Sequence, residues 1–230
     1  MINIYVKGRY CVTSLKDDID GFIDAAARGQ LDEVKRYVKA GMDINARCPL
    51  EGDTVLNYAA SADNLLMVKW LIKHQADPNL ANDSKETALH YATFNGSLDI
   101  MAALLQGKAN PDLRNDDGMT PLAWAARRGQ SDAAKLLLDA GADPDIADRS
   151  GNTPLLWAAK MGNAPLVTQL LEKNASLKHT NLSGEDAEKL ARKGGHKDVL
   201  TALAAFREQQ RTDKLQTRQD RLRQYLRRKP

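Results

Sequence analysis

The sequence TPLAWA at residues 120–125 recurs as TPLLWA at residues 153–158, and two looser copies, TVLNYA and TALHYA, occupy residues 54–59 and 87–92. The four threonines that open these copies are spaced by 33 residues. A fixed period of this length is typical of repeat proteins in which each unit packs only on its neighbours. The copies therefore set the register from which the rest of the chain can be assigned.

Each copy has the features of a helix start. Threonine is a favourable N-cap, and Pro121 and Pro154 stand at the first helical position, where a missing N–H costs no hydrogen bond. The apolar residues that follow predict one short helix per copy. Gly96, Gly129 and Gly162 are expected to end these helices in a left-handed conformation, and Asp63 stands at the same position of the first copy.

A second apolar stretch follows in each repeat, as in residues 133–138, and predicts a second helix. It ends at turns of the type ADPN, at residues 76–79, 109–112 and 142–145, where proline breaks the helix. Gly52, Gly118 and Gly151 then predict hairpin turns before the next threonine. The third hairpin has Lys85 where glycine is expected, which makes its geometry the hardest to predict.

This pattern resembles the ankyrin repeat over about residues 17–206, with a matching period and a matching TPLHxA signature. The resemblance implies an all-α fold, a solenoid of stacked helix-turn-helix units with projecting β-hairpin turns. We expect about six units, because residues 22–47 and 184–206 are degenerate copies that would cap the two ends. The expected organisation is an N-terminal extension at 1–16, with a weak hairpin signal in residues 2–12, the repeat domain at 17–206 and a basic helical tail at 207–230.

The composition excludes several classes of protein. The chain has 230 residues, 33 basic and 30 acidic side chains and 43% hydrophobic residues, which is ordinary globular composition. No apolar run approaches the roughly 20 residues of a membrane-spanning helix, and Lys7 and Arg9 interrupt the first apolar stretch, so a signal peptide is not expected. Cys11 and Cys48 are too few for a disulfide framework. We expect a monomeric cytoplasmic protein with reduced thiols.

Catalytic chemistry is not predicted. The sequence has no P-loop, no GxSxG, no HExxH and no dinucleotide fingerprint. The four histidines lie in different units without the spacing of metal ligands, and the acids at the hairpin tips are expected to face solvent, where nothing would raise a pKa. We therefore expect no enzyme activity, no cofactor and no metal site.

The resemblance implies that the concave side of the stack binds another protein through the hairpin tips and the ends of the first helices. Matched by register, the tip residues are Glu51, Asp53, Asp83, Glu86, Asp116, Asp117, Met119, Arg149 and Asn152. The helix-end residues are Phe94, Asn95, Arg127, Arg128, Lys160 and Met161. The tips are mainly acidic and the later helix ends basic, with Phe94 and Met161 as apolar anchors. Any single charge among them is interpreted first as an ordinary solvated side chain.

Two further features of the repeats are interpreted as structural. Tyr58, Tyr91, Trp124 and Trp157 recur every 33 residues and are predicted to fill the core between units rather than to form a ligand platform. His90 retains the histidine of the family signature, and the resemblance implies that it braces a hairpin by hydrogen bonds.

The tail carries nine basic and three acidic side chains, a net charge of +6, which leaves −3 for residues 1–206. Leu215, Leu222 and Leu226, with Tyr225 beside them, form a narrow apolar stripe. Three interpretations remain open: a solvated extension of the last cap, an arm that docks on a partner protein, or a contact to nucleic acid or anionic lipid. The residues nominated for such contacts are Arg218, Arg221, Arg223, Arg227 and Arg228.

Overall fold

The computed structural model describes residues 15–227, apart from the side chains of Lys16, Leu222 and residues 225–227. The hairpin predicted at residues 2–12 lies outside the described residues. A short 3-10 helix at Leu15–Asp17 precedes the α-helices. These are α1 (Ile19–Ala27), α2 (Leu31–Lys39), α3 (Val55–Ser61), α4 (Leu65–Lys73), α5 (Ala88–Asn95), α6 (Leu98–Gln106), α7 (Pro121–Arg128), α8 (Ser131–Asp139), α9 (Pro154–Met161), α10 (Ala164–Glu172), α11 (Ala187–Gly194) and α12 (Lys197–Arg227).

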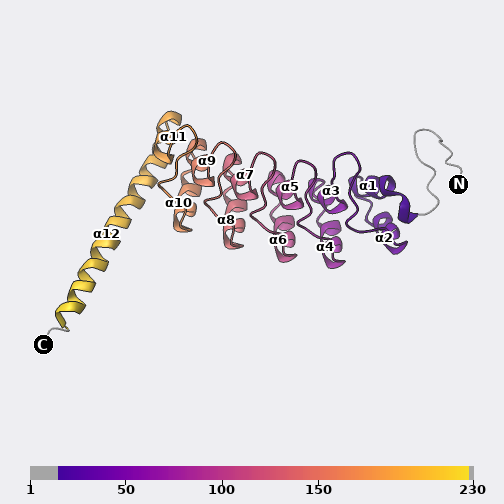
Figure 1. Ribbon diagram of the computed structural model, residues 1–230, viewed down its shortest axis with the longest axis horizontal. Coiled ribbons are helices and arrows are strands. Elements are labelled where there is room, and N and C mark those ends of the chain that lie inside the picture. The colour runs from indigo at the N-terminus through magenta and orange to yellow at the C-terminus, as the bar shows by residue number, and fades with distance from the viewer. Residues whose placement is uncertain (1–14, 228–230) are drawn as a thin grey trace. The chain divides into compact units, whose positions relative to one another are not determined.

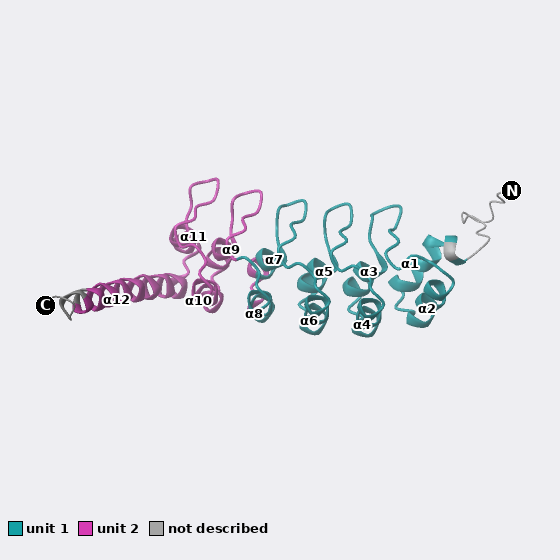
Figure 2. Cartoon of the chain, turned by 60° about the horizontal axis from the view of Figure 1, so that its bottom comes forward, with its two compact units in different colours: residues 1–125, 132–143 teal, residues 126–131, 144–230 magenta. Residues whose placement is uncertain are grey.

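The helices follow one another in pairs, an odd-numbered first helix and an even-numbered second helix, joined to the next pair by a long loop (Figure 1). The chain divides into two compact units, coloured separately in Figure 2. Unit 1 comprises residues 15–125 and 132–143 of the described chain, and unit 2 comprises residues 126–131 and 144–227. Within residues 15–227, the only strand-like pairing is an isolated bridge between Arg47 and Thr54.

The predicted helix starts are confirmed. The hydroxyl oxygen of Thr54 accepts a hydrogen bond from the N–H of Asn57 at 3.2 Å. Thr120 caps α7 in the same way at 3.2 Å, and Thr153 caps α9 at 3.4 Å. Pro121 and Pro154 begin their helices, as their fixed φ favours.

The predicted helix ends are also confirmed. Gly96 and Gly162 end α5 and α9 with φ values of 75° and 76°. Asp63 adopts φ 56° at the equivalent position of the first copy. Lys85 likewise adopts the left-handed conformation, with φ 61°, and its hairpin still closes through the N–H of Asn82, which donates to the carbonyl of Glu86 at 2.9 Å. The third hairpin therefore forms without glycine.

The core is built from the leucines and alanines of the first helices together with apolar residues of the second helices. In unit 1, α1, α3 and α5 contact one another in sequence, and α4 contacts α6. The fully buried side chains at the repeated positions are Leu56, Ala59, Leu89, Ala92, Leu122, Ala125, Leu155 and Ala158. Because alanine is small, adjacent helices can approach closely at this position.

A row of side-chain hydrogen bonds joins consecutive turns after the second helices. Asn45 Oδ1 accepts from the N–H of Asp77 at 2.9 Å, and Asn79 Oδ1 accepts from the N–H of Asn110 at 2.7 Å. In unit 2, Asp145 accepts in the same way from Ser176 at 2.7 Å. Each turn therefore satisfies a backbone donor of the next turn along the chain.

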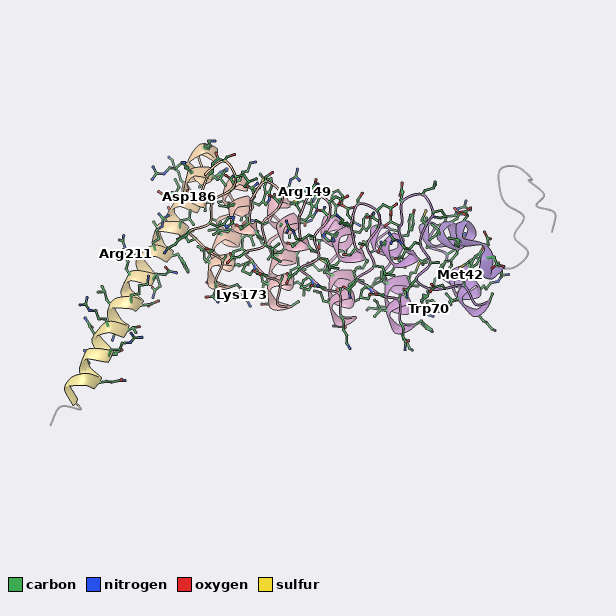
Figure 3. All side chains as sticks on the ribbon, in the orientation of Figure 1. Met42, Trp70, Arg149, Lys173, Asp186 and Arg211 are labelled. Carbon is green, nitrogen blue, oxygen red and sulfur yellow. The ribbon has the colours of Figure 1, made fainter. Side chains whose placement is uncertain are left out.

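The tail is a continuation of the last helix. In α12, Val199 and Leu203 are buried and α12 contacts α10 and α11, whereas residues 208–221 are exposed. The guanidinium of Arg207 pairs with the carboxylate of Glu188 on α11. Figure 3 shows the side chains around Arg211 projecting outward along the exposed part of the helix. The predicted helical extension is confirmed.

Candidate functional site

The surface of interest is formed by the odd-numbered helices and the long loops that precede them, which lie on the same side of unit 1 (Figure 2). We call this surface the first-helix face and describe it separately in each unit. It contains every nominated tip and helix-end residue. The geometry decides which of those side chains are accessible.

An Asn or Asp side chain braces the base of each later loop. Asn82 Oδ1 accepts hydrogen bonds from the backbone N–H groups of Ser84 at 3.0 Å and Glu86 at 2.9 Å. The same pair of hydrogen bonds is accepted by Asn115, Asp148 and Asn181. These residues also recur every 33 positions, a signal visible in the sequence that the prediction did not use. Such turns present the loop tips in a fixed conformation.

The outermost acids of the loops in unit 1 are accessible. Asp83 lies 3.3 Å from Arg47, and Asp116 lies 2.9 Å from Lys85, so two of the tip acids have basic neighbours. Exposed pairs of this kind contribute little to stability. The tip acids that are exposed are Glu51, Asp83 and Asp117.

Three nominated tip residues are not accessible, which corrects the prediction. Asp53, Met119 and Asn152 are all buried, with Met119 only 1% exposed. Each directly precedes a capping threonine, where the chain turns from the loop toward the helix and the side chain points inward. Glu86 occupies the same position and is half-buried. The shared register of these four residues explains why they behave alike.

Asp53 shows what this inward position does. Its carboxylate accepts hydrogen bonds from Asn57 Nδ2 at 3.0 Å, from the hydroxyl of Tyr91 at 3.3 Å and from Asn82 Nδ2 at 3.4 Å. All three donors are neutral side-chain groups. The inward position thus ties the loop before α3 to the loop before α5 and to α5 itself.

The aromatic column is also placed differently from the prediction. Tyr58, Tyr91, Trp124 and Trp157 are half-buried and lie on the first-helix face, not in the core. Each aromatic follows the buried leucine by two residues, and two residues turn an α-helix by about 200°. The aromatic side chain must therefore leave the helix on nearly the opposite side from the leucine.

In unit 2, two basic side chains lie over the ring of Trp157, a member of the aromatic column. The guanidinium of Arg127 lies 5.2 Å from the ring centroid of Trp157, and the ammonium of Lys160 lies 4.8 Å from it. Both distances are within the range of cation–π attraction. The indole N–H of Trp157 donates to Asp148 Oδ2 at 2.9 Å, which fixes the ring. The other nominated residues that are exposed in unit 2 are Arg128, Arg149 (Figure 3) and Met161.

In unit 1 the column borders a hollow of about 250 Å³, lined by Ser61, Glu86, His90, Tyr91, Phe94, Asn95 and Trp124. The rings of Phe94 and Trp124 meet edge to face, with centroids 5.8 Å apart. Asn95 is exposed, and its amide donates to the carbonyl of Ser61 at 2.9 Å. We call this site the aromatic hollow. It brings together three nominated residues, Glu86, Phe94 and Asn95.

Charge and burial act together on the ionisable groups of the hollow. Burial is the main cause that raises the pKa of Glu86, and the carboxylates of Asp53 and Asp117 raise it further. Burial and the charges of Asp53 and Glu86 also raise the pKa of Tyr91. The expectation that nothing would raise the pKa of a tip acid was therefore wrong for Glu86.

His90 lies at the floor of this region and is 2% exposed. Its Nδ1 lies 2.9 Å from the hydroxyl of Thr87 and accepts from the Thr87 N–H at 3.2 Å, while Nε2 lies 3.1 Å from the carbonyl of Met119. Burial lowers its pKa from 6.5 to about 4. The predicted bracing role of His90 is confirmed.

No cluster of three or more His, Cys, Asp or Glu side chains in residues 15–227 is arranged to hold a metal ion. No helix among the described residues is long and apolar enough to cross a membrane. In the tail, the nominated side chains of Arg218, Arg221 and Arg223 are exposed. The side chain of Arg227 and all of Arg228 lie outside the described part of the chain.

Comparisons with known proteins agree on the repeat. The family model described as ankyrin repeats (3 copies) matches residues 22–115 and 104–181. Among solved structures, an ankyrin-repeat domain from Acinetobacter baumannii is similar with a TM-score of 0.75 and 27% identity, covering 80% of this chain and 96% of that domain. The ankyrin-repeat protein EF0377 is similar with a TM-score of 0.75 and 27% identity, covering 81% of this chain and 97% of that protein. A search of curated sequences found no match.

Proposed function

Because the chain belongs to the ankyrin-repeat family, we propose that it is a non-catalytic cytoplasmic module that binds another protein through its first-helix face. Ankyrin repeats generally mediate protein–protein interaction. Binding of this kind suits an adaptor, an inhibitor or an immunity-type protein, and the fold is compatible with each. We propose that the chain acts as a monomer.

The observation that carries the proposal is the exposure of large apolar side chains at the ends of first helices. Phe94 at the end of α5 is 47% exposed, and Met161 at the end of α9 is 44% exposed. In each unit the apolar side chain lies close in sequence to charged or aromatic residues of the same face. Interface energy usually concentrates in aromatic and Arg anchors surrounded by polar residues.

We predict that Phe94→Ser weakens binding of the native partner by about thirtyfold or more, the loss of a contact of about 2 kcal/mol. The measurement is affinity capture from the native cell extract, followed by titration of the captured protein against purified variants. Phe94 is at the surface, so helical content by circular dichroism should stay at the wild-type level.

The matched control is Leu66→Ser. Leu66 is 73% exposed but lies on α4, a second helix, and not on the first-helix face. It should bind the partner within about twofold of the wild type. Equal weakening by both substitutions would show general loss of structure, and weakening by Leu66→Ser alone would place the interface on the second helices instead.

The exposed half of α12 supports a second candidate function, contact with nucleic acid through the tail. Residues 211–230 carry eight basic and two acidic side chains, a net charge of +6. Two of these arginines have acidic neighbours, Arg211 with Glu208 at 3.5 Å and Arg223 with Asp220 at 3.4 Å. Exposed pairs contribute little, so they leave most of the positive field in place.

If the tail binds nucleic acid, a chain ending at Gln210 should bind nonspecific duplex DNA at least about tenfold more weakly than the full chain at low salt. This end point keeps the pair of Arg207 and Glu188, so the last helix pair stays packed. The affinity of the full chain should also fall steeply as salt rises. Equal affinity of the two chains in a low-salt fluorescence anisotropy titration would exclude this second function.

A further inference from the structure

The residue before each capping threonine is in register with the side chain that braces the next loop. We call the first place the acceptor position, and it is held by Asp53, Glu86, Met119 and Asn152. We call the second place the loop-base position, and it is held by Asn82, Asn115, Asp148 and Asn181. Each loop-base residue follows its acceptor position by 29 residues. The two side chains of each pair can therefore be compared as chemical partners.

In the first pair, a carboxylate receives an amide. Asn82 Oδ1 faces its own loop, where it accepts from Ser84 and Glu86, so the Nδ2 group must find its acceptors elsewhere. It donates to the hydroxyl of Tyr91 at 2.9 Å and to the carboxylate of Asp53 at 3.4 Å. The Tyr91 hydroxyl in turn donates to Asp53 at 3.3 Å. Asp53 therefore fixes the orientation of the Asn82 amide.

Two further pairs with Asn at the loop base show the same match. In unit 1, burial raises the pKa of Glu86, and a side-chain hydrogen bond with Asn115 counteracts this rise. A hydrogen bond that favours the ionised carboxylate is one that the carboxylate accepts, so Asn115 is the donor. In unit 2, Asn181 Nδ2 donates to Asn152 Oδ1 at 3.0 Å and to Glu185 at 3.2 Å. An oxygen acceptor is thus present wherever the loop base has an amide to donate.

The remaining pair has Asp at the loop base and a different partner. Asp148 has no amide to donate, and its Oδ1 accepts from the N–H groups of Ser150 at 2.8 Å and Asn152 at 2.9 Å. Its Oδ2 accepts from the indole N–H of Trp157 at 2.9 Å. Its acceptor position holds Met119, which brings neither a carboxylate nor an amide. Two carboxylates that face each other repel, and none of the four pairs combines them.

From these contacts we infer that Asp53 is a positioning residue for the loop at residues 82–86, and that each acceptor position determines whether Asn or Asp can brace the next loop. Asp53 acts through Asn82, whose oxygen holds two backbone N–H groups of that loop. Glu86 extends the constraint to Asn115 in the following loop. The inference rests on the proposed function only where these loops are assigned to the binding face. It adds how that face is kept in one conformation before a partner binds.

The experiment replaces the first pairing of unit 1 by the other pairing that the chain contains. Asp53→Met removes the acceptor oxygen, as at Met119. It is made together with Asn57→Ala, because the amide of Asn57 donates to Asp53 and would otherwise lose its acceptor. Asn82→Asp supplies the carboxylate of the Met119-type pair. The Asp53 change and the Asn82 change are tested separately and combined, in the full chain.

The readout is hydrogen exchange of the Ser84 and Glu86 N–H groups, measured by NMR. Either change alone should increase both exchange rates by about tenfold. The first leaves the Asn82 amide without a carboxylate, and the second sets two carboxylates against each other. The combination should return both rates to within about threefold of the wild type. The reason is that the hydroxyl of Tyr91 can donate to the new carboxylate, as the indole does in unit 2.

Asp83→Asn is the matched control. It removes an exposed acid of the same loop, whose carboxylate lies 3.3 Å from Arg47, and it should leave both exchange rates within about twofold of the wild type. If the Asp53 change alone prevents folding, recovery of the fold in the combination supports the inference, and continued unfolding contradicts it. Folding of every variant is checked by circular dichroism.

Independent effects would overturn the inference. In that case the combination would raise the exchange rates by the product of the separate effects, about a hundredfold. Unchanged rates after the Asp53 change would overturn it as well. The failure of the proposed function is recognised separately, because exchange is measured without a partner. If the combination restores the exchange rates but Phe94→Ser leaves partner capture unchanged, the positioning role stands and the interface lies elsewhere.

Discussion

Replacing Met119 with alanine is expected to lower the free energy of unfolding by about 2–5 kcal/mol, because it removes a large buried side chain and leaves a cavity. Met119 is 1% exposed, and its backbone is held on both sides, by Asn115 Oδ1 at 3.0 Å and by His90 Nε2 at 3.1 Å. A backbone held in this way cannot easily collapse into the space. The change is measured by urea unfolding followed by circular dichroism.

Met161→Ala is the matched control. It removes the same side chain from a position that is 44% exposed, and it should change the free energy of unfolding by no more than about 0.5 kcal/mol. Leu66→Ala provides a second exposed control within unit 1. If Met119→Ala were as mild as these controls, Met119 would belong to the surface, as its position in the hairpin first indicated.

The fold could be predicted because local signals and the repeat agree. Thr54 and its three counterparts cap helices, proline begins two of them, and glycine or Asp63 ends them, so each unit is specified by residues only a few positions apart. Copies at a fixed period then require the units to stack in the same way. Even Lys85 adopts the left-handed conformation that glycine has at the equivalent positions. The contacts with neighbouring units therefore outweigh the unfavourable backbone conformation of a non-glycine residue.

The candidate site was predicted less completely, because accessibility depends on the direction in which a side chain leaves the backbone. The register placed Met119 in a hairpin, but it did not show that the residue before a capping threonine turns inward. For Tyr91 and Trp124, helix geometry alone could have given the position. Each follows a buried leucine by two residues, a rotation of about 200° around the helix axis, which places the aromatic side chain on the first-helix face. Whether the remaining nominated residues bind a partner stays a prediction.

The hollow itself could not be read from the sequence. It depends on Glu86, Phe94 and Trp124, which lie on a loop and two helices from two successive repeats. Each of these residues has an ordinary explanation alone, as a tip acid, an exposed apolar residue or part of the aromatic column. Only the folded arrangement brings these three residues to the wall of one hollow.

Acidification is expected to destabilise the protein through His90 by about 3 kcal/mol between pH 7.5 and pH 4. Burial lowers the pKa of His90 from 6.5, the value for an exposed imidazole, to about 4. The unfolded chain therefore binds a proton at a pH where the folded chain does not. The stabilisation is complete above pH 6.5 and is lost as the pH falls toward 4.

The test is the difference between the wild type and His90→Asn, since Asn57 occupies the equivalent position of the preceding repeat. This variant should be less stable at pH 7.5, because the hydrogen bond to the carbonyl of Met119 is lost. Between pH 7.5 and pH 4, the free energy of unfolding of the variant should nevertheless decrease less than that of the wild type, and the difference should be about 3 kcal/mol. Carboxylates that titrate in this range are common to both proteins and cancel. His74→Asn changes an exposed histidine at the C-cap of α4 and should retain the full wild-type loss. Equal losses in His90→Asn and the wild type would show that His90 can be protonated within the folded protein.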